Sequence, residues 1–373
     1  MEKKKVLIIA ASNMSLSGVP VVFMSIIRSL SDKYTFDIVV LDDKDMYFEN
    51  EFLSYGGKIF RYINPKPTGL LRKLIWFFGG FKRNASLFIK NKLRLSDYCA
   101  IHSFSGEFGS ILFKTEKKNN KIVKIFHVCS ALSVYKEKLT IKQILWNCNF
   151  NDVYKYADKV LYVSKAALKY AKNKQKSDVL YNIYDEERFN KIENCVHDDL
   201  SLTQIGTFSS RKNQLFSLRV ITLLKNTFPN VKLNIVGKEI EAGYYNKILK
   251  FIEEKSLKNN VDIFNDKSDR IYINRNTSYV IYPSIQDSFG LVLIESQASG
   301  IHCFASNTIP QDADMGNIEF LPLNEKRWAD TIKEYFLKNR NKRIIPTEKD
   351  KFSKTTFSKK LISIYNQHDE KFN

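Results

Sequence analysis

The most informative segment of the sequence is YPSIQDSFGLVLIESQASG, residues 282–300. It begins where an apolar strand ends, and it contains a small turn at Gly290 after which apolar residues enter a helix. This geometry presents the backbone N–H groups of residues 288–291 at a helix N-terminus, where a diphosphate binds without a metal. Asp287 and Glu295 flank the turn, and Glu295, about a turn into the helix, is placed to accept hydrogen bonds from ribose hydroxyls.

Apolar segments of strand length alternate with helical segments on both sides of this stretch. The alternation predicts α/β architecture with two Rossmann-like, doubly wound domains that face each other across a cleft. The polar segment 186–200 is the expected linker. We expect an N-terminal domain over 1–190, a nucleotide-binding domain over 200–351, and a C-terminal helix, about 352–373, that packs back on the first domain. The predicted strands are 4–11, 36–41, 122–128, 159–164, 178–181, 202–208, 231–237, 261–264, 279–284, 302–306 and 318–323.

Composition narrows the class of protein and of partner. Hydrophobic residues make up 44% of the 373 residues, which excludes global disorder. Lys and Arg number 59 against 40 Asp and Glu, a formal charge of +19 that favours an anionic partner unless it reflects only codon bias. The five cysteines are scattered and lack CxxC spacing, which is typical of neither a disulfide framework nor a zinc site, so a reducing cytosol is expected. No nucleic-acid recognition module is recognisable, and no apolar run is long enough to span a membrane.

One segment, 61–96, concentrates the basic charge. It has no acidic residue, and aromatic residues interleave with the basic ones, a pattern that suits the interface of an anionic membrane. The same pattern is typical of an ordinary helix with an aromatic face in the core and a basic face in solvent, and both interpretations stay open. The basic residues are Arg61, Lys66, Arg72, Lys73, Lys82, Arg83, Lys90, Lys92 and Arg94.

Several motifs in register resemble glycosyltransferase family 4, retaining enzymes of GT-B fold whose signature pairs an acidic residue with a Glu eight positions on. Residues 282–300 resemble that signature, IGTFSSRKNQLF (205–216) the donor diphosphate loop, and VLYNIYDEERF (179–189) the interdomain segment. The segments VSKAAL and IFHV and the Ser17–Gly18 loop stand in the expected order. IESQASGIHCFASNTIP (294–310) is most similar to the branch that builds capsules and exopolysaccharides.

The resemblance implies roles for particular residues. Glu295 would hold the nucleotide ribose, and Asp287 would contact the donor sugar. Lys212 would neutralise the leaving diphosphate, and His127, at the end of a strand, would lie beside the sugar. The donor-binding backbone would be that of Gly18, Gly206, Ser288, Phe289, Gly290 and Leu291.

The sequence departs from the family pattern at four positions. Ser17 replaces one Gly of the usual Gly-Gly pair in the first loop, and Ile183 replaces a Gly in the interdomain segment. Asp287 stands where the family usually has Glu, and Thr207 stands where it typically has an Arg that contacts phosphate. Arg211, beside Lys212, is our hypothesis for the missing charge. His102, at the end of another predicted strand, is either a residue that lines the acceptor cleft or a satisfied core histidine.

The resulting expectation is a retaining glycosyltransferase, peripheral on the cytoplasmic face of the cell membrane. It would move a sugar from a nucleotide-sugar donor to a growing surface glycan carried on a polyprenyl diphosphate lipid. Neither a metal nor another cofactor is expected, because the DxD sequences at 43–45 and 312–314 lack neighbouring ligands. The alternatives are transfer to a protein acceptor, and a catalytically weakened homologue that acts as a scaffold subunit.

Overall fold

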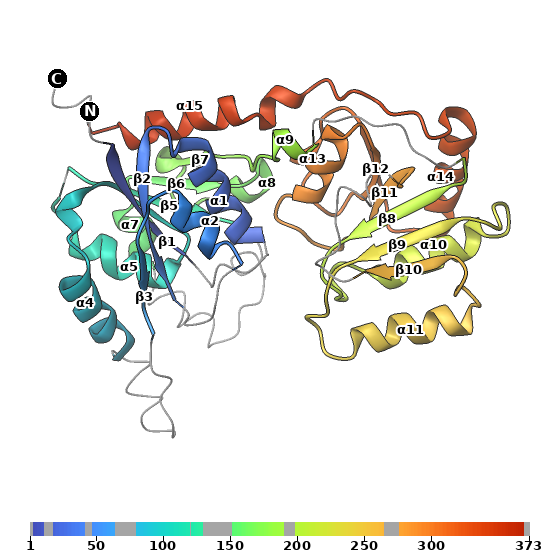
Figure 1. Cartoon of the computed structure of the whole chain (residues 1–373), viewed down its shortest axis with the longest axis horizontal. Helices are drawn as coiled ribbons and strands as arrows, with labels where there is room; N and C mark the ends of the chain where they lie inside the picture. Colours follow the sequence, from blue (N-terminus) through green and yellow to red (C-terminus); the bar gives the residue numbers. More distant parts are fainter. Residues whose placement is uncertain are drawn as a thin grey trace. The chain divides into compact units, whose positions relative to one another are not determined.

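The structure, a computed structural model, divides the chain into two compact units (Figure 1). Residues 1–182 with 354–373 form the first unit, and residues 183–353 form the second. The structure describes residues 3–10, 18–41, 47–63, 80–119, 121–129, 151–189, 198–264 and 276–368.

The first unit is built on a seven-stranded sheet in the order β3-β2-β1-β4-β5-β6-β7, and every neighbouring pair is parallel. The central strands are almost fully buried, which is why they read as continuous apolar runs. The strands are β1 (Lys4–Ile9), β2 (Tyr34–Val40), β3 (Ile59–Arg61), β4 (Tyr98–Ser103), β5 (Val123–Val128), β6 (Lys159–Tyr162) and β7 (Ser177–Val179).

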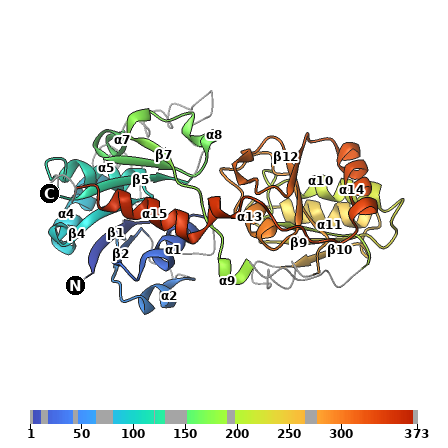
Figure 2. The ribbon, with the colours of Figure 1, turned by 90° about the horizontal axis from the view of Figure 1, so that it is seen from above.

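Helices cover this sheet, and the last helix of the chain returns to it. Side chains from α4, α5 and α7 form a core with the central strands. The C-terminal helix α15 contacts α1, as Figure 2 shows from above. The helices are α1 (Gly18–Leu30), α2 (Glu49–Ser54), α4 (Phe81–Lys92), α5 (Gly106–Thr115), α7 (Asp152–Tyr156), α8 (Lys165–Leu168) and α15 (Lys354–Tyr365), with short 3-10 turns η2 (Leu95–Asp97) and η3 (Lys174–Lys176).

The second unit has a six-stranded parallel sheet in the order β10-β9-β8-β11-β12-β13. Numbered within the unit, this order is 3-2-1-4-5-6, the order of doubly wound dinucleotide-binding sheets. Its strands are β8 (Ser201–Ile205), β9 (Lys232–Val236), β10 (Val261–Phe264), β11 (Tyr279–Tyr282), β12 (His302–Ser306) and β13 (Ile318–Leu321). Its helices are α9 (Glu186–Phe189), α10 (Gln214–Leu224), α11 (Tyr244–Glu254), α13 (Leu291–Ala298) and α14 (Glu325–Asn339), with η4 (Gln311–Ala313) and η5 (Lys349–Phe352).

The predicted fold class, two doubly wound α/β units, is confirmed by these sheets. The edge strand β3 went unpredicted because it is only three residues long and half-buried. The start of the segment interpreted as a linker folds as α9, whose Phe189 is buried and accepts a hydrogen bond from Ser299 Oγ at 3.1 Å. Residues 190–197 of that segment lie outside the described residues.

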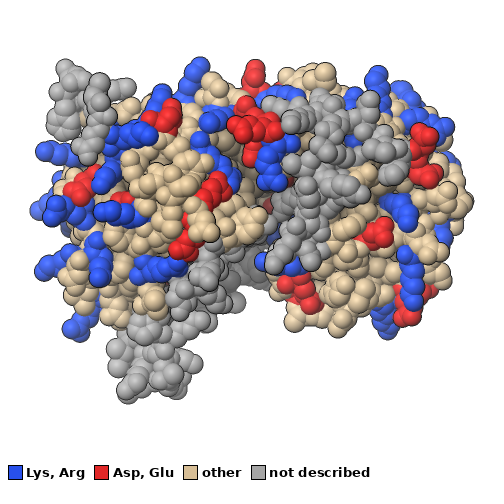
Figure 3. Space-filling model, in the orientation of Figure 1, with Lys and Arg blue, Asp and Glu red and all other residues tan. Residues whose placement is uncertain are grey.

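The described part of the basic segment has its aromatic residues turned inward. The rings of Phe81 and Phe88 pack edge-on against Tyr62, with centroids 6.1 and 5.2 Å away. Lys82 and Arg83 are exposed on the opposite side of α4, and in Figure 3 blue side chains gather where Figure 1 places this helix. Arg61 is instead paired with Glu49 at 2.7 Å. Residues 64–79, with Lys66, Arg72 and Lys73, lie outside the described residues.

Candidate functional site

The loop between β8 and α10, residues 206–213, is a tight turn at the carboxyl edge of the second sheet. The N–H of Gly206 donates to Val236 O at 2.9 Å, and the N–H groups of Lys212 and Asn213 donate to Ser209 O. Asn213 has φ 60°, a left-handed conformation that Asn tolerates better than most residues. A Cβ on Gly206 would lie 3.4 Å from the stem of Lys212, so that side chain crosses closely over the glycine.

The loop that follows β11 binds directly to the first loop. Ile285 N–H and Ser284 Oγ both donate to Arg211 O, at 2.9 and 3.2 Å. The loop ends at Gly290, whose φ of 98° suits glycine and which precedes α13. A Cβ there would approach Leu293 Cδ1 to 3.0 Å. The strands β8 and β11 are neighbours in the sheet, so the two loops emerge side by side.

Three polar side chains meet between these loops. The ammonium group of Lys212 donates to Tyr282 OH at 2.5 Å and to a carboxylate oxygen of Asp287, and Tyr282 OH donates to the same oxygen. Arg211 Nη1 lies 3.9 Å from the other Asp287 oxygen and donates to Gln286 O at 3.1 Å. The side chains of Lys212 and Asp287 are only 13% and 15% exposed.

The side chains of this cluster shift one another's pKa values. Burial lowers the pKa of Lys212, and the Asp287 carboxylate opposes that shift. Burial alone would raise the pKa of Asp287, but Lys212, Tyr282 and Arg211 together hold that pKa below its usual value. Burial and then Asp287 raise the pKa of the Tyr282 phenol well above its usual range. The arrangement is an ion pair bridged by a neutral phenol, with Arg211 as an additional cation.

The predicted backbone contacts around α13 are only partly open to a ligand. The N–H of Ser288 donates to Asp287 Oδ1 at 2.8 Å, so this amide is already used within the loop. Phe289 is buried, and its ring packs edge-on against Phe352 at 5.7 Å, so its side chain anchors the turn. Leu291 is the first residue of α13. Glu295 lies in α13, partly buried, and its carboxylate contributes to the raised pKa of Tyr282.

Two predicted residues belong to the first unit. Gly18 is the first residue of α1, and a Cβ on it would meet no atom within 4 Å. His127, in β5, is buried, with Nδ1 3.2 Å from His102 Nε2. Burial lowers the pKa of His127 to about 3. His102 is fully buried and bonded to His127 and Tyr365, which favours the core-histidine interpretation. Ser17 lies outside the described residues.

Sequence reasoning missed three residues that shape the site. Tyr282 ends an apolar strand, where a tyrosine is typically a core residue, and only the fold brings its hydroxyl to Lys212. Gly237 directly follows β9, and a Cβ there would lie 2.0 Å from Gly206 O, so the close approach of these backbones requires glycine. Glu241 accepts hydrogen bonds from Ser210 N–H and Oγ, both at 2.7 Å, and so occupies part of the first loop.

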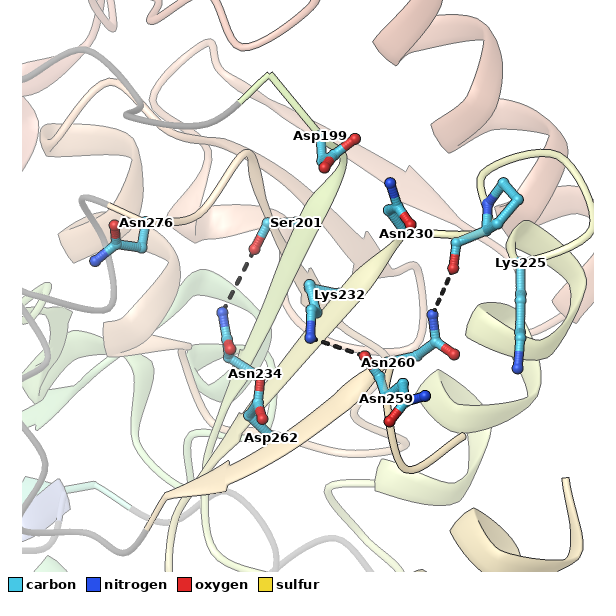
Figure 4. A pocket seen from close by; sticks show the side chains of 11 residues that line it. Asp199, Ser201, Lys225, Asn230, Lys232, Asn234, Asn259, Asn260, Asp262 and Asn276 are labelled. Carbon is cyan, nitrogen blue, oxygen red and sulfur yellow. Dashed lines mark hydrogen bonds between the residues drawn. The ribbon is translucent and has the colours of Figure 1, made fainter. Parts of the chain in front are cut away.

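A polar hollow of about 600 Å³ lies at the other edge of the second sheet (Figure 4). It is lined at the amino ends of the strands, by Ser201 of β8, Lys232 of β9 and Asp262 of β10 among others. Ligands of doubly wound sheets bind outside the carboxyl ends of the strands, so this hollow is separate from the cluster around Lys212.

Known proteins resemble this chain in sequence and in fold. Residues 185–344, all within the second unit, match the family model described as glycosyl transferases group 1. The capsular polysaccharide biosynthesis glycosyltransferase CapH of Staphylococcus aureus is 25% identical over 375 residues, which cover 95% of this chain and 96% of that protein. The chain is a glycosyltransferase.

Solved structures share the fold of this glycosyltransferase over nearly its whole length. Anabaena HepE in complex with UDP and glucose superposes with a TM-score of 0.75 at 14% identity, over 96% of this chain and 98% of that one. WaaG, a glycosyltransferase involved in lipopolysaccharide biosynthesis, gives 0.64 at 13% identity over 98% of each chain. The chain therefore has the GT-B fold.

The described residues contain no group of three or more His, Cys, Asp or Glu side chains placed to hold a metal ion. Among the helices that the structure describes, none is long and apolar enough to cross a membrane.

Proposed function

We propose that this glycosyltransferase binds a nucleotide-sugar donor at the carboxyl edge of the second sheet and moves its sugar to a growing surface glycan. The observation that carries the proposal is the cluster of Lys212, Arg211 and Asp287 between the loops after β8 and β11. Glu295 of α13, near the same cluster, is the proposed ribose ligand. The support from relatives is that HepE is described in complex with UDP-glucose and that CapH is named for capsular polysaccharide biosynthesis.

The proposed reaction exchanges one bond of the sugar for another. The bond between the anomeric carbon and the diphosphate oxygen breaks, and a bond to an acceptor hydroxyl oxygen forms on the same face, which gives retention. The acceptor's proton passes to the departing diphosphate, so no protein base is needed. Negative charge grows on the diphosphate, and the cations Lys212 and Arg211 with the N-terminus of α13 stabilise it without a metal.

When the donor binds, it competes for groups that the protein now pairs internally. Lys212 bonds Asp287 and Tyr282, and it must share its ammonium protons with a phosphate oxygen. Asp287 would then be free to accept from a sugar hydroxyl while Arg211 compensates its charge. Because Asp287 is one methylene shorter than the usual Glu, we propose that it sets which donor sugar is accepted.

The acceptor is proposed to be a glycan on a polyprenyl diphosphate, handled at the cytoplasmic face of the cell membrane. The exposed Lys82 and Arg83 on α4 support an anionic surface as partner. Two alternatives compete with this proposal. The first is transfer of the sugar to a protein acceptor, and the second is a scaffold role without catalysis.

A panel of nucleotide sugars tests the proposal. The protein is incubated with each donor alone, with a polyprenyl-diphosphate-linked saccharide, and with a protein acceptor, and nucleoside diphosphate release is measured. We expect turnover of one donor that the lipid-linked saccharide stimulates, and a product whose anomeric configuration by NMR equals that of the donor. If the protein neither binds nor turns over any donor under any of these conditions, the result would support the scaffold role.

A further inference from the structure

A buried chain of hydrogen bonds runs through the first unit from the C-terminal helix to His127. Tyr365 OH in α15 lies 2.9 Å from His102 Nδ1, and His102 Nε2 lies 3.2 Å from His127 Nδ1. Tyr365, His102 and His127 are at most 2% exposed. His127 Nε2, at the far end, is buried without a hydrogen-bond partner among the described residues.

The rings of this chain are held by packing as well as by hydrogen bonds. Phe104 stacks on both His102 and His127, with each pair of centroids 5.0 Å apart. On the other side, the ring of Tyr34 contacts Tyr365 edge-on at 5.3 Å, and its own hydroxyl donates to Asn366 Oδ1. Because packing fixes the positions of the rings, only the positions of the protons on the ring nitrogens and the hydroxyl can vary.

Each imidazole in the chain carries one proton at neutral pH. Burial lowers the pKa of His127 to about 3, and burial together with His127 lowers the pKa of His102 well below its ordinary value. A neutral imidazole has one donor nitrogen and one acceptor nitrogen, so the two hydrogen bonds fix both tautomers together. Only two arrangements exist, and they differ in the direction in which every bond points.

The phenol decides between the two arrangements. His102 Nδ1 is the only hydrogen-bond partner of Tyr365 OH within the described residues. If the phenol accepted from His102, its own proton would be buried without a partner, which is costly. If it donates, His102 Nε2–H donates to His127 Nδ1, and the proton of His127 stands on Nε2.

We propose that Tyr365 is a positioning residue that acts through His102 to fix His127 with its proton on Nε2, so that His127 presents an N–H donor to a ligand oxygen. This inference rests on the proposed function, in which that oxygen is a hydroxyl of the donor sugar. His127 then binds and orients the sugar as a neutral donor, and it takes no proton from the acceptor.

The test is the tautomer of His127, read from ring nitrogens in the full-length protein labelled with 15N-histidine. Protonated and unprotonated ring nitrogens resonate far apart, and the His127 signals are assigned by their loss in His127→Gln. We expect Nε2 of the wild-type protein to be the protonated nitrogen. Tyr365→Phe keeps the ring but removes the donor, and it should shift the tautomer ratio at least about fivefold toward Nδ1–H.

Tyr34→Phe is the matched control, because it removes a phenol from the same cluster but outside the chain of bonds. It should leave the His127 signals unchanged. A wild-type protein with Nδ1 protonated, or a Tyr365→Phe spectrum identical to wild type, would overturn the inference. If Tyr365→Phe does not fold, the wild-type spectrum still decides the tautomer.

Donor kinetics separate this inference from the proposed function. Tyr365→Phe should raise the donor KM about tenfold, the loss of one good hydrogen bond, with a smaller effect on kcat. If donors are turned over but the tautomer does not respond to Tyr365, the chain of bonds has no such role and the proposed function stands. If the tautomer responds but no donor binds, the proposed function fails instead.

Discussion

The ammonium group of Lys212 and the carboxylate of Asp287 are hydrogen-bonded to each other although 75 residues separate them in the sequence. They meet because each lies in the loop after one of two neighbouring parallel strands, β8 and β11. The carboxyl ends of parallel strands share one edge of the sheet, so two distant motifs become one site. This pairing gives the glycosyltransferase its candidate donor site.

Arg211 should be needed for turnover as a second cation. Arg211→Ala removes a charge 3.9 Å from Asp287, and we expect kcat to fall by roughly 10 to 100 times because less of the diphosphate charge is compensated. Arg219→Ala is the control, since Arg219 is similarly exposed but pairs with Glu325 in the same unit. Normal kinetics in Arg211→Ala would remove Arg211 from the site.

Alanine substitutions at two glycines should have different effects, one on the stability of the fold and the other on donor binding. In Gly237→Ala the new Cβ would meet Gly206 O at 2.0 Å, and we expect the free energy of unfolding to fall by roughly 3 kcal/mol. In Gly18→Ala the Cβ meets nothing within 4 Å, so stability should stay within about 0.5 kcal/mol of wild type while the donor KM rises. Urea unfolding and donor titration give the two quantities. A Gly18→Ala protein with wild-type KM would place the donor elsewhere.

His302 should make the protein less stable in acid. Burial lowers its pKa to about 4, against about 6.5 in an unfolded chain. Between these values the unfolded state binds a proton that the folded state does not, so this contribution is present above about pH 6.5 and is lost as the pH falls toward 4. His302→Phe keeps a ring beside Tyr335 and should reduce the loss of stability from pH 7 to pH 5 by roughly 1 to 2 kcal/mol. An unchanged loss would contradict the burial argument.

The basic face of α4 should bind anionic vesicles. Lys82, Arg83 and Lys90 are exposed, and replacing all three by Ser should weaken binding by roughly 3 kcal/mol, about 100-fold, at low salt. The control replaces Lys247, Lys250 and Lys258, exposed in or just after α11 of the second unit. Sedimentation with anionic vesicles at two salt concentrations measures the binding of each variant. If the vesicles retain the two variants equally, the basic face of α4 has no special role in binding, and the positive charge of the chain is explained by codon bias.

The sequence predicted strands well where they are long and buried, as in β1 and β5, because parallel strands under helices are continuous apolar runs. It failed at β3, where three half-buried residues give no pattern. Motif residues such as Lys212 and Asp287 stood out individually, but their partner Tyr282 did not, because a hydroxyl at a strand end resembles core packing. The chain from Tyr365 to His127 joins residues from three distant segments, and no local pattern indicates it.

The most direct test of the donor site is nucleoside diphosphate release from the nucleotide-sugar panel by wild type and by Lys212→Met, with Lys232→Met at the opposite edge of the sheet as control. We predict that wild type and Lys232→Met turn over the same donor and that Lys212→Met is slower by roughly 100 to 1000 times. An unchanged rate in Lys212→Met, or no donor turned over by wild type with or without a lipid-linked acceptor, would contradict the account.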